Sequence, residues 1–240
     1  FKNIYNNKFI NKYLTPFLEK ICLLDGDLGE KNFGIDNEIL DKINIDIIIN
    51  NAASIKFNDK MSVAYKNNCE TVINILECCE KFFKNLKKFI HVSTFYVNFP
   101  KDKNSNTEFN YNDIINDIKN GQELEEINQK YKCSFANSYV FTKFLAEEII
   151  KNDKNIFVKN IIRPSIIANS YNFPYSGWND SYAAYTGFNL SFGTGIINYI
   201  LTDKESGFSL DKKLNTVPVD YVSKIISETT FNNNKELYIN

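Results

Sequence analysis

The sequence predicts an α/β fold, a doubly wound parallel sheet with helices on both faces. Short apolar runs rich in β-branched residues alternate with longer stretches of helical spacing. The short runs are apolar on both faces, which is typical of parallel strands buried between two layers of helices. A length of 240 residues with 43% hydrophobic content is enough to bury one sizeable core. We therefore expect a single domain over residues 1–240, in which about residues 169–211 form a small lobe beside the ligand.

The predicted elements follow in order along the chain. The strands are expected at Lys20–Leu28, where the strand ends in a turn, and at Ile45–Ala53, Lys88–Val97 and Phe157–Ser165. Residues 60–84 and 138–152 repeat apolar side chains at helical spacing and are predicted to be helices. The segment Lys101–Lys132 is rich in Asn, Asp and Glu, which predicts a surface insertion with one polar helix. Crossovers between the parallel strands should be right-handed.

The composition excludes several classes of protein. The net charge is −1 with acids and bases interspersed, so there is no electrostatic footprint for nucleic acid or an anionic membrane. No apolar run approaches the length of a membrane span, and residues 1–9 lack the apolar core of a signal peptide. The five cysteines form no CxxC pair and there is one histidine, so no metal site is expected. These features predict an intracellular protein with reduced thiols.

Small and polar residues follow the predicted strands, where open parallel sheets bind their ligands. Asp27 follows the first strand, Ala52 and Ala53 the second, and Ser93 and Thr94 lie near the end of the third. The alanines would let a flat cofactor approach, Asp27 would accept from an adenine amine, and the hydroxyls would lie near a substrate carbonyl. Each position also has a structural alternative: packing for the alanines, a cap or turn for the aspartate, and local backbone bonds for the hydroxyls.

Tyr139 precedes Lys143 by four residues in the stretch NSYVFTKFLAEE. The pair alone is weak, because the chain has 14 Tyr and 28 Lys plus Arg. In a helix, however, this spacing puts both side chains on one face, where the ammonium would lower the pKa of the phenol. Tyr139 could then donate a proton to an oxygen that gains charge as hydride arrives at its carbon, and Thr94 or Ser93 would hold that oxygen. Lys143 would also reach a ribose hydroxyl of the hydride donor.

Nine blocks, in order, resemble one family. They are GDLGEKNFGI (Gly26–Ile35), NNAASIKFND (Asn50–Asp59), NCETVINILE (Asn68–Glu77), FIHVSTFYVN (Phe89–Asn98), SYVFTKFLAEE (Ser138–Glu148), IIRPSII (Ile161–Ile167), PYSGWND (Pro174–Asp180), SFGTGI (Ser191–Ile196) and VPVDYV (Val217–Val222). The chain resembles the fatty acyl-CoA reductases, the male sterility branch of the extended short-chain dehydrogenase/reductases. The fourth and seventh blocks, which contain HVST and GW, favour this family over the sugar epimerases, which share the general fold.

The resemblance implies a Rossmann-like NAD(P)-binding reductase domain that uses NADPH to reduce long-chain acyl-CoA through the aldehyde to the fatty alcohol. By the same resemblance Tyr139 is the proton donor, Lys143 its activator and ribose contact, and Thr94 the polarising hydroxyl, with Ser93 in reserve. The implied cofactor contacts are Asp27 and Leu28 at the adenine, Ala52 and Ala53 in the middle, and Arg163, Pro164, Ser165 and Ile166 on the nicotinamide side.

The chain also departs from the family. The Gly-rich loop that binds the cofactor pyrophosphate is absent, since Gly26, Gly29 and Gly34 follow the wrong strand. The glycine of the family's NVLGT motif is replaced by Thr71, three residues after Asn68, which is expected to be structural. We therefore expect an N-terminally truncated member of the family, without the first two strands, that binds NADPH weakly on its own. Attachment to the endoplasmic reticulum or peroxisome through other segments, and the oligomeric state, are left open.

Two other functions remain open. One is a different extended reductase or epimerase that acts on a small carbonyl compound or a nucleotide sugar. The other is a catalytically inactive remnant that serves as a binding module, which the absent loop favours. The aromatic stretch Ser181–Ile200 suits either an acyl-chain wall or plain core, and His91 is predicted to be a core histidine without a role.

Overall fold

The computed structural model describes residues 15–97, 110–198, 214–232 and 237–239. The chain divides into two compact units. We call Asp25–Arg163 with Thr229–Asn240 the sheet unit, and Phe1–Leu24 with Pro164–Glu228 the second unit. Each is described by itself.

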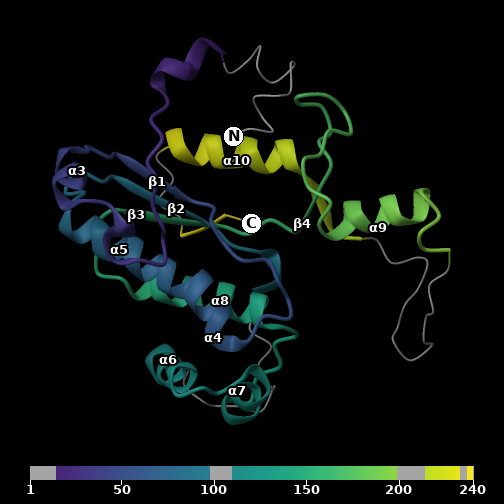
Figure 1. The fold of residues 1–240 in the computed structure, drawn as a ribbon, viewed down its shortest axis with the longest axis horizontal. Helices are drawn as coiled ribbons and strands as arrows, with labels where there is room; N and C mark the ends of the chain where they lie inside the picture. Colours follow the sequence, from purple (N-terminus) through teal and green to yellow (C-terminus); the bar gives the residue numbers. More distant parts are fainter. Residues whose placement is uncertain (1–14, 98–109, 199–213, 233–236, 240) are drawn as a thin grey trace. The chain divides into compact units, whose positions relative to one another are not determined.

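The sheet unit is built on a parallel sheet of four strands in the order β1-β2-β3-β6 (Figure 1). The strands are β1 (Ile47–Asn50), β2 (Lys88–Val92), β3 (Val158–Ile162) and β6 (Tyr238–Ile239). All five residues of the inner strand β2 are buried; Phe89, Ile90 and Val92 are apolar, and Lys88 and His91 are buried polar residues. The predicted α/β class with a parallel sheet is confirmed, and three of the four predicted strands form at the expected places.

The strand predicted at Lys20–Leu28 is wrong. Lys20 ends a 3-10 helix, η1 (Thr15–Lys20), and residues 21–28 have no regular structure. Leu23 and Leu24 are 67% and 51% exposed. A strand needs the backbone groups of a neighbour, and residues 21–28 pair with no strand in the described part of the chain. The apolar pattern alone therefore did not produce a strand.

The helix predicted over residues 60–84 forms as one run with a widened turn in its middle. It consists of α4 (Met61–Tyr65), a π-helical turn η3 (Lys66–Glu70) and α5 (Thr71–Lys81). Asn68 lies in the π-helical turn and is buried. Its amide accepts from the Ser54 backbone N–H at 2.7 Å and donates to the Thr142 hydroxyl at 2.9 Å. Asn68 therefore joins the loop after β1 to helix α8, which confirms the structural role expected for it.

Helix α8 (Ser138–Asn152) has the bounds that the sequence predicts. Asn137, the residue before the helix, is its N-terminal cap, because its side chain accepts the Val140 backbone N–H at 2.9 Å. Helices α4, α5 and α8 lie on the same side of the sheet (Figure 1). The apolar residues of α8 in the core are Phe141, Phe144, Leu145, Ala146, Ile149 and Ile150.

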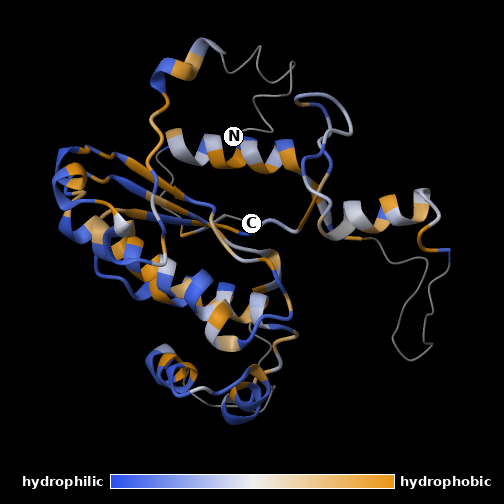
Figure 2. Cartoon of the chain, in the orientation of Figure 1, coloured by the Kyte–Doolittle hydropathy of each residue, from blue (hydrophilic) through white to orange (hydrophobic). Residues whose placement is uncertain are grey.

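The segment Lys101–Lys132 is predicted to be an insertion with one polar helix. Its described part contains two helices, so the predicted number of helices is wrong. They are α6 (Tyr111–Lys119) and α7 (Leu124–Tyr131), and residues 101–109 lie outside the described part. Gly121 takes a φ of +90°, which separates the helices and favours glycine. Both helices are amphipathic (Figure 2) and attach to the core through buried isoleucines, namely Ile114, Ile118 and Ile127. Because these side chains are buried, the insertion is part of the core and is not purely a surface feature.

The remaining elements of the sheet unit are short, and the second unit has its own small sheet. The sheet unit also contains η2 (Lys31–Gly34), α3 (Asn37–Lys42) and η4 (Phe95–Val97). The second unit contains β4 (Ile166–Ala168), β5 (Thr216–Pro218), α9 (Ala184–Gly193) and most of α10 (Val219–Phe231). Strands β4 and β5 pair in parallel. The carboxylate of Asp220 accepts the backbone N–H groups of Tyr171, Asn172 and Phe173, which holds the loop after β4 to the start of α10.

A buried ion pair joins α8 to the end of β3. Glu147 is 1% exposed, and its carboxylate accepts from Arg163 Nε at 3.1 Å and Nη2 at 2.5 Å. Arg163 is the only arginine of the chain, and its guanidinium also lies 4.0 Å from the centre of the Tyr238 ring on β6. A two-point guanidinium contact fixes direction as well as distance. The pair therefore sets how α8 lies against β3 and β6.

We expect Asn137→Ala to lower the free energy of unfolding by about 1 kcal/mol, because α8 loses its N-terminal cap. Urea unfolding measures the change. Asn116→Ala is the matched control, since Asn116 is exposed in the middle of α6 and makes no side-chain hydrogen bond in the described part of the chain. Equal effects of the two substitutions would contradict the capping role.

We expect Glu147→Gln to destabilise the sheet unit by roughly 3 kcal/mol or more, because it leaves the Arg163 charge without its buried partner. The adjacent Glu148→Gln is the control. Glu148 pairs at 3.5 Å with Lys151, whose side chain is 52% exposed, so its loss should cost under about 1 kcal/mol. Denaturant unfolding compares the two, and a Glu147→Gln effect no larger than the Glu148→Gln effect would show that the pair does not hold α8.

Candidate active site

The structure brings Tyr139 and Thr94 together. Tyr139 lies in the first turn of α8 and is half-buried, and Thr94 follows β2 and is 6% exposed. The Thr94 side chain faces the Tyr139 phenol closely enough to act on its pKa, which it lowers. The ring of Phe57, from the loop after β1, packs on Tyr139 with its centroid 5.7 Å away. Residues from two strand ends and from α8 therefore meet at one edge of the sheet.

Ser93 lies beside this contact without taking part in it. It is 4% exposed, and its backbone N–H donates to the Ile162 carbonyl at 2.7 Å, which extends the pairing of β2 and β3. Its hydroxyl has no hydrogen-bond partner in the described part of the chain. Leaving a buried hydroxyl unpaired costs free energy, so Ser93 has an unused donor at the end of the central strand.

Lys143 is buried and points to β2. It is 2% exposed, and its Nζ donates to the Val92 carbonyl at 2.6 Å and lies 3.2 Å from His91 Nε2. Burial lowers the pKa of Lys143 to about 8, while the neighbouring Glu147 and Cys69 act in the opposite direction. The amine is therefore close to its titration range near neutral pH.

The expectation that Lys143 lowers the pKa of Tyr139 is not met in this structure. Burial raises the pKa of Tyr139 above its ordinary value, and the nearby Thr94 side chain only partly opposes this. The physical reason is that the Lys143 amine binds groups of β2 and not the phenol, so desolvation has the largest effect on the pKa of Tyr139. Tyr139 is consequently in its protonated form at neutral pH, which is the form that a proton donor needs.

His91 is the residue that the sequence missed. It is 1% exposed, as predicted for a core histidine, but its ring lies between two polar side chains. Nε2 faces Lys143, and Nδ1 lies 3.1 Å from Asn50 Nδ2. Asn50 and His91 are directly opposite each other in the register of β1 and β2. The signal in the sequence was a polar residue at corresponding positions of two otherwise apolar strands.

Asp27 and Leu28, the residues predicted to contact the adenine, form hydrogen bonds within the sheet unit. Asp27 is exposed, and its carboxylate accepts the Gly29 backbone N–H at 2.8 Å, which is the turn role given above as its alternative. The Leu28 carbonyl accepts from Asn74 of α5 at 2.8 Å. Ala52 and Ala53 are exposed in the loop after β1, so a ligand can approach their backbone.

The predicted nicotinamide-side residues divide between the two units. Arg163 ends the sheet unit, and its guanidinium is engaged by Glu147. Pro164, Ser165 and Ile166 belong to the second unit, with Ile166 opening β4. The structure thus gives Arg163 a structural partner, and the cofactor role of all four residues stays a prediction.

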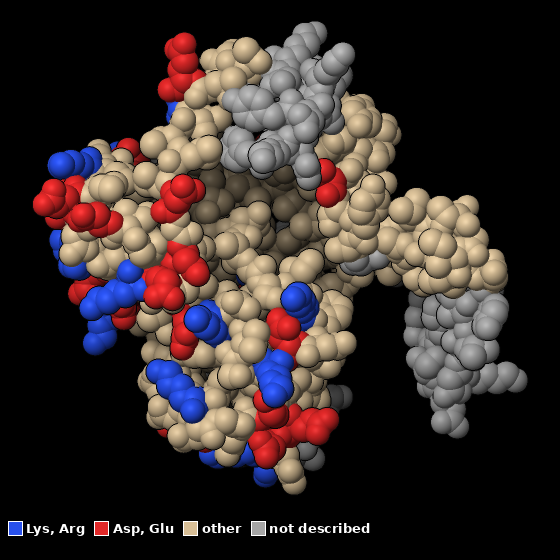
Figure 3. Space-filling model, viewed as in Figure 1, with Lys and Arg blue, Asp and Glu red and all other residues tan. Residues whose placement is uncertain are grey.

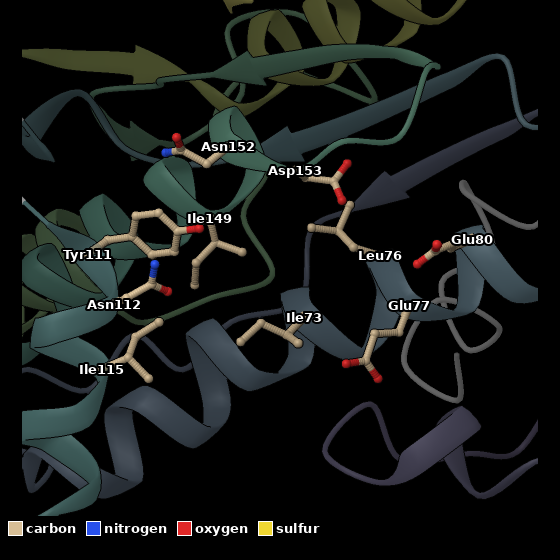
Figure 4. Close-up of a pocket in the computed structure, with 10 residues that line it drawn as sticks. All are labelled: Ile73, Leu76, Glu77, Glu80, Tyr111, Asn112, Ile115, Ile149, Asn152 and Asp153. Carbon is tan, nitrogen blue, oxygen red and sulfur yellow. The ribbon is translucent and has the colours of Figure 1, made fainter.

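A separate hollow lies near the C-terminal end of α8 (Figure 4). It has a volume of about 270 Å³ and opens between α5, α6 and the end of α8. Its apolar residues include Ile73, Leu76, Ile115 and Ile149, and its carboxylates are Glu77, Glu80 and Asp153. Asn152, which also lines it, is 13 residues from Tyr139, or roughly 20 Å along a helix. This hollow is therefore distinct from the Tyr139–Thr94 contact.

Helix α9 in the second unit carries no charge and exposes large apolar side chains. Phe188, Leu190 and Phe192 are 45%, 48% and 36% exposed. In Figure 3 the surface of this helix shows no acidic or basic side chain, whereas both kinds are intermixed over the sheet unit. In the part of the chain that the structure describes, no helix is long and apolar enough to cross a membrane.

Comparisons with known proteins concern the family and the fold of the chain. The NAD-binding family profile described as male sterility protein matches residues 1–226. Fatty acyl-CoA reductase 1 of Gallus gallus is 27% identical over 223 residues, which cover 86% of this chain and 40% of that protein. The chain spans about two fifths of the length of the first curated relatives that it matches.

Two solved structures show the same fold. The terminal R domain from the myxalamid PKS-NRPS biosynthetic pathway superposes with a TM-score of 0.66 at 19% identity, covering 95% of this chain and 50% of that one. Gre2 from Candida albicans, solved in complex with NADPH, superposes with a TM-score of 0.56 at 16% identity, covering 97% and 68%. The profile match over nearly the whole chain shows that this chain belongs to the male sterility protein family, the family of the fatty acyl-CoA reductases.

Proposed function

We propose that the protein reduces long-chain fatty acyl-CoA to the fatty alcohol, through the aldehyde, with NADPH as the reductant. The observation that carries this proposal is that the Thr94 side chain, after β2, faces the Tyr139 phenol, with Lys143 one helical turn further along α8. This arrangement offers two hydroxyl groups to one carbonyl oxygen, and the Lys143 amine lies against the end of β2. Its chemistry is that of carbonyl reduction.

The roles follow from the protonation states. Tyr139 is protonated at neutral pH and can give its proton to the oxygen of the aldehyde as the second hydride reaches the carbon. Thr94 donates to the same oxygen in both reductions and stabilises the charge that develops there. In the first reduction the carbon–sulfur bond of the thioester breaks, and coenzyme A leaves as the thiol after taking up a proton.

The residues around the contact suit a nicotinamide cofactor. NADPH would supply the hydride. The exposed backbone of Ala52 and Ala53 leaves room for the middle of the cofactor, and the amine of Lys143 provides a donor for a ribose hydroxyl. The Gre2 structure with NADPH supports a nicotinamide nucleotide as the ligand of this fold, and the choice of NADPH over NADH is part of the proposal.

The long acyl chain suits the second unit. Helix α9 exposes Phe188, Leu190 and Phe192 without a charged residue, which is the kind of surface that an acyl chain binds. The names of the curated relatives support an acyl-CoA substrate.

We expect Tyr139→Phe to lower the rate of NADPH oxidation with palmitoyl-CoA by about 10²-fold or more, because the proton donor is lost. The complete protein is assayed by the absorbance of NADPH, with palmitoyl-CoA and with a small aldehyde. Tyr111→Phe is the matched control, since Tyr111 lines the hollow of Figure 4 and should retain full activity. Near-normal reduction by Tyr139→Phe would remove Tyr139 from its role, and activity with the small aldehyde alone would contradict the acyl-CoA substrate.

We expect Thr94→Val to lower kcat by roughly 10²- to 10³-fold with little change in the Kd for NADPH, because a donor to the developing oxyanion is lost. Ser93→Ala is the comparison and should change kcat far less, since its hydroxyl does not contact Tyr139. Steady-state kinetics and cofactor titration separate the two effects. The reverse ranking would make Ser93 the polarising hydroxyl.

A further inference from the structure

A chain of polar groups runs from Lys143 to the loop after β1. Lys143 Nζ lies 3.2 Å from His91 Nε2, and His91 Nδ1 lies 3.1 Å from Asn50 Nδ2. The other amide atom of Asn50, Oδ1, accepts the Ala52 backbone N–H at 3.3 Å. Asn50, His91 and Lys143 are each at most 3% exposed, so water does not substitute for these partners. The donors and acceptors of this chain must therefore match one another.

Because Asn50 Oδ1 accepts from the Ala52 N–H, its Nδ2 faces His91, and this orientation decides where the proton of His91 lies. Asn50 Nδ2 is a donor, so His91 Nδ1 must accept, and a neutral imidazole then carries its proton on Nε2. That N–H points at Lys143, and only an uncharged amine has a lone pair to accept it. This arrangement therefore belongs to the state in which Lys143 is neutral.

A charged Lys143 requires the opposite arrangement. An ammonium has donors only, so His91 Nε2 must accept from it and the ring proton moves to Nδ1. The Asn50 amide must then turn so that Oδ1 accepts from Nδ1. The turn exchanges two groups of similar size and needs no repacking. It also replaces Oδ1 by Nδ2 opposite the Ala52 backbone N–H, so two donors face each other and the Ala52 N–H needs another acceptor.

We propose that His91 is a positioning residue that couples the charge of Lys143 to the backbone of Ala52 through its tautomer and the amide of Asn50. In the charged state of Lys143, the N–H of Ala52 is available to an acceptor atom of a bound nucleotide. In the neutral state of Lys143, Asn50 Oδ1 accepts the Ala52 N–H. The catalytic meaning of this coupling rests on the proposed reductase function: a nucleotide acceptor at Ala52 would favour the charged form of the amine that serves Tyr139.

The surrounding charges allow Lys143 to be the group that titrates. Burial and the nearby Lys143 hold the pKa of His91 well below its ordinary value, so the ring stays neutral. Burial raises the pKa of Cys69, in the π-helical turn, and of Tyr139, on α8, so both stay protonated. Glu147, also on α8, is held by Arg163. The pKa of Lys143 lies at about 8.

The single histidine of the chain makes the tautomer directly measurable. We would label the 240-residue chain with [¹⁵N]histidine and record long-range ¹H–¹⁵N correlations from about pH 6 to about pH 10, where only His91 contributes. The expected result is a neutral ring with its proton on Nδ1 at low pH, which moves to Nε2 with a midpoint near pH 8. Circular dichroism at each pH confirms that the chain remains folded.

Two substitutions at Lys143 should fix the ring in opposite states. Lys143→Arg remains charged over this range and should hold the proton on Nδ1 at every pH, whereas Lys143→Met has no charge and should hold it on Nε2. Lys151→Met, in the last turn of α8 where the amine is exposed, is the control and should leave the change near pH 8 intact.

Three results would overturn the coupling: an imidazolium that forms near pH 6, one tautomer throughout in the unsubstituted chain, or the same change in Lys143→Met. The measurement does not depend on turnover. A chain that shows the tautomer change without reducing acyl-CoA would contradict the proposed function alone. A protein that reduces acyl-CoA with a fixed tautomer would contradict the coupling alone.

Discussion

The arrangement depends on the burial of one amine. Lys143 is 2% exposed, and a buried amine must find acceptors inside the protein. It finds them at the end of β2, in the Val92 carbonyl and the ring of His91. These contacts fix the position of α8 relative to the end of β2. Because Tyr139 lies one turn before Lys143, the same contacts place its phenol at Thr94.

Successive turns of α8 reach different parts of the sheet unit. Thr142 bonds to Asn68 and through it to the loop after β1, Lys143 reaches β2, and Glu147 holds Arg163 at the end of β3. A helix tied to three elements by directional bonds has little freedom to shift, which suits a site that must hold its donors within fractions of an ångström. The apolar face of α8 supplies the burial that makes these polar bonds strong.

The protonation state of the site follows from desolvation more than from paired charge. Burial acts on Tyr139 and on Lys143 in the same sense, since it favours the uncharged form of each. The phenol therefore keeps its proton, and the amine approaches neutrality. The proposed proton donor is therefore protonated at neutral pH, and in the proposed coupling the charge of Lys143 is what a ligand would change.

The sequence by itself determined α8 and its Tyr139–Lys143 pair, three of the strands and the hydroxyls near the end of β2, because helical spacing and buried-strand patterns are local. Only the tertiary structure decided which hydroxyl meets Tyr139, that Lys143 binds His91, and that residues 21–28 form no strand. These outcomes depend on partners that are distant in the sequence. A strand exists only beside another strand, and a buried polar atom takes the partner that the fold places next to it.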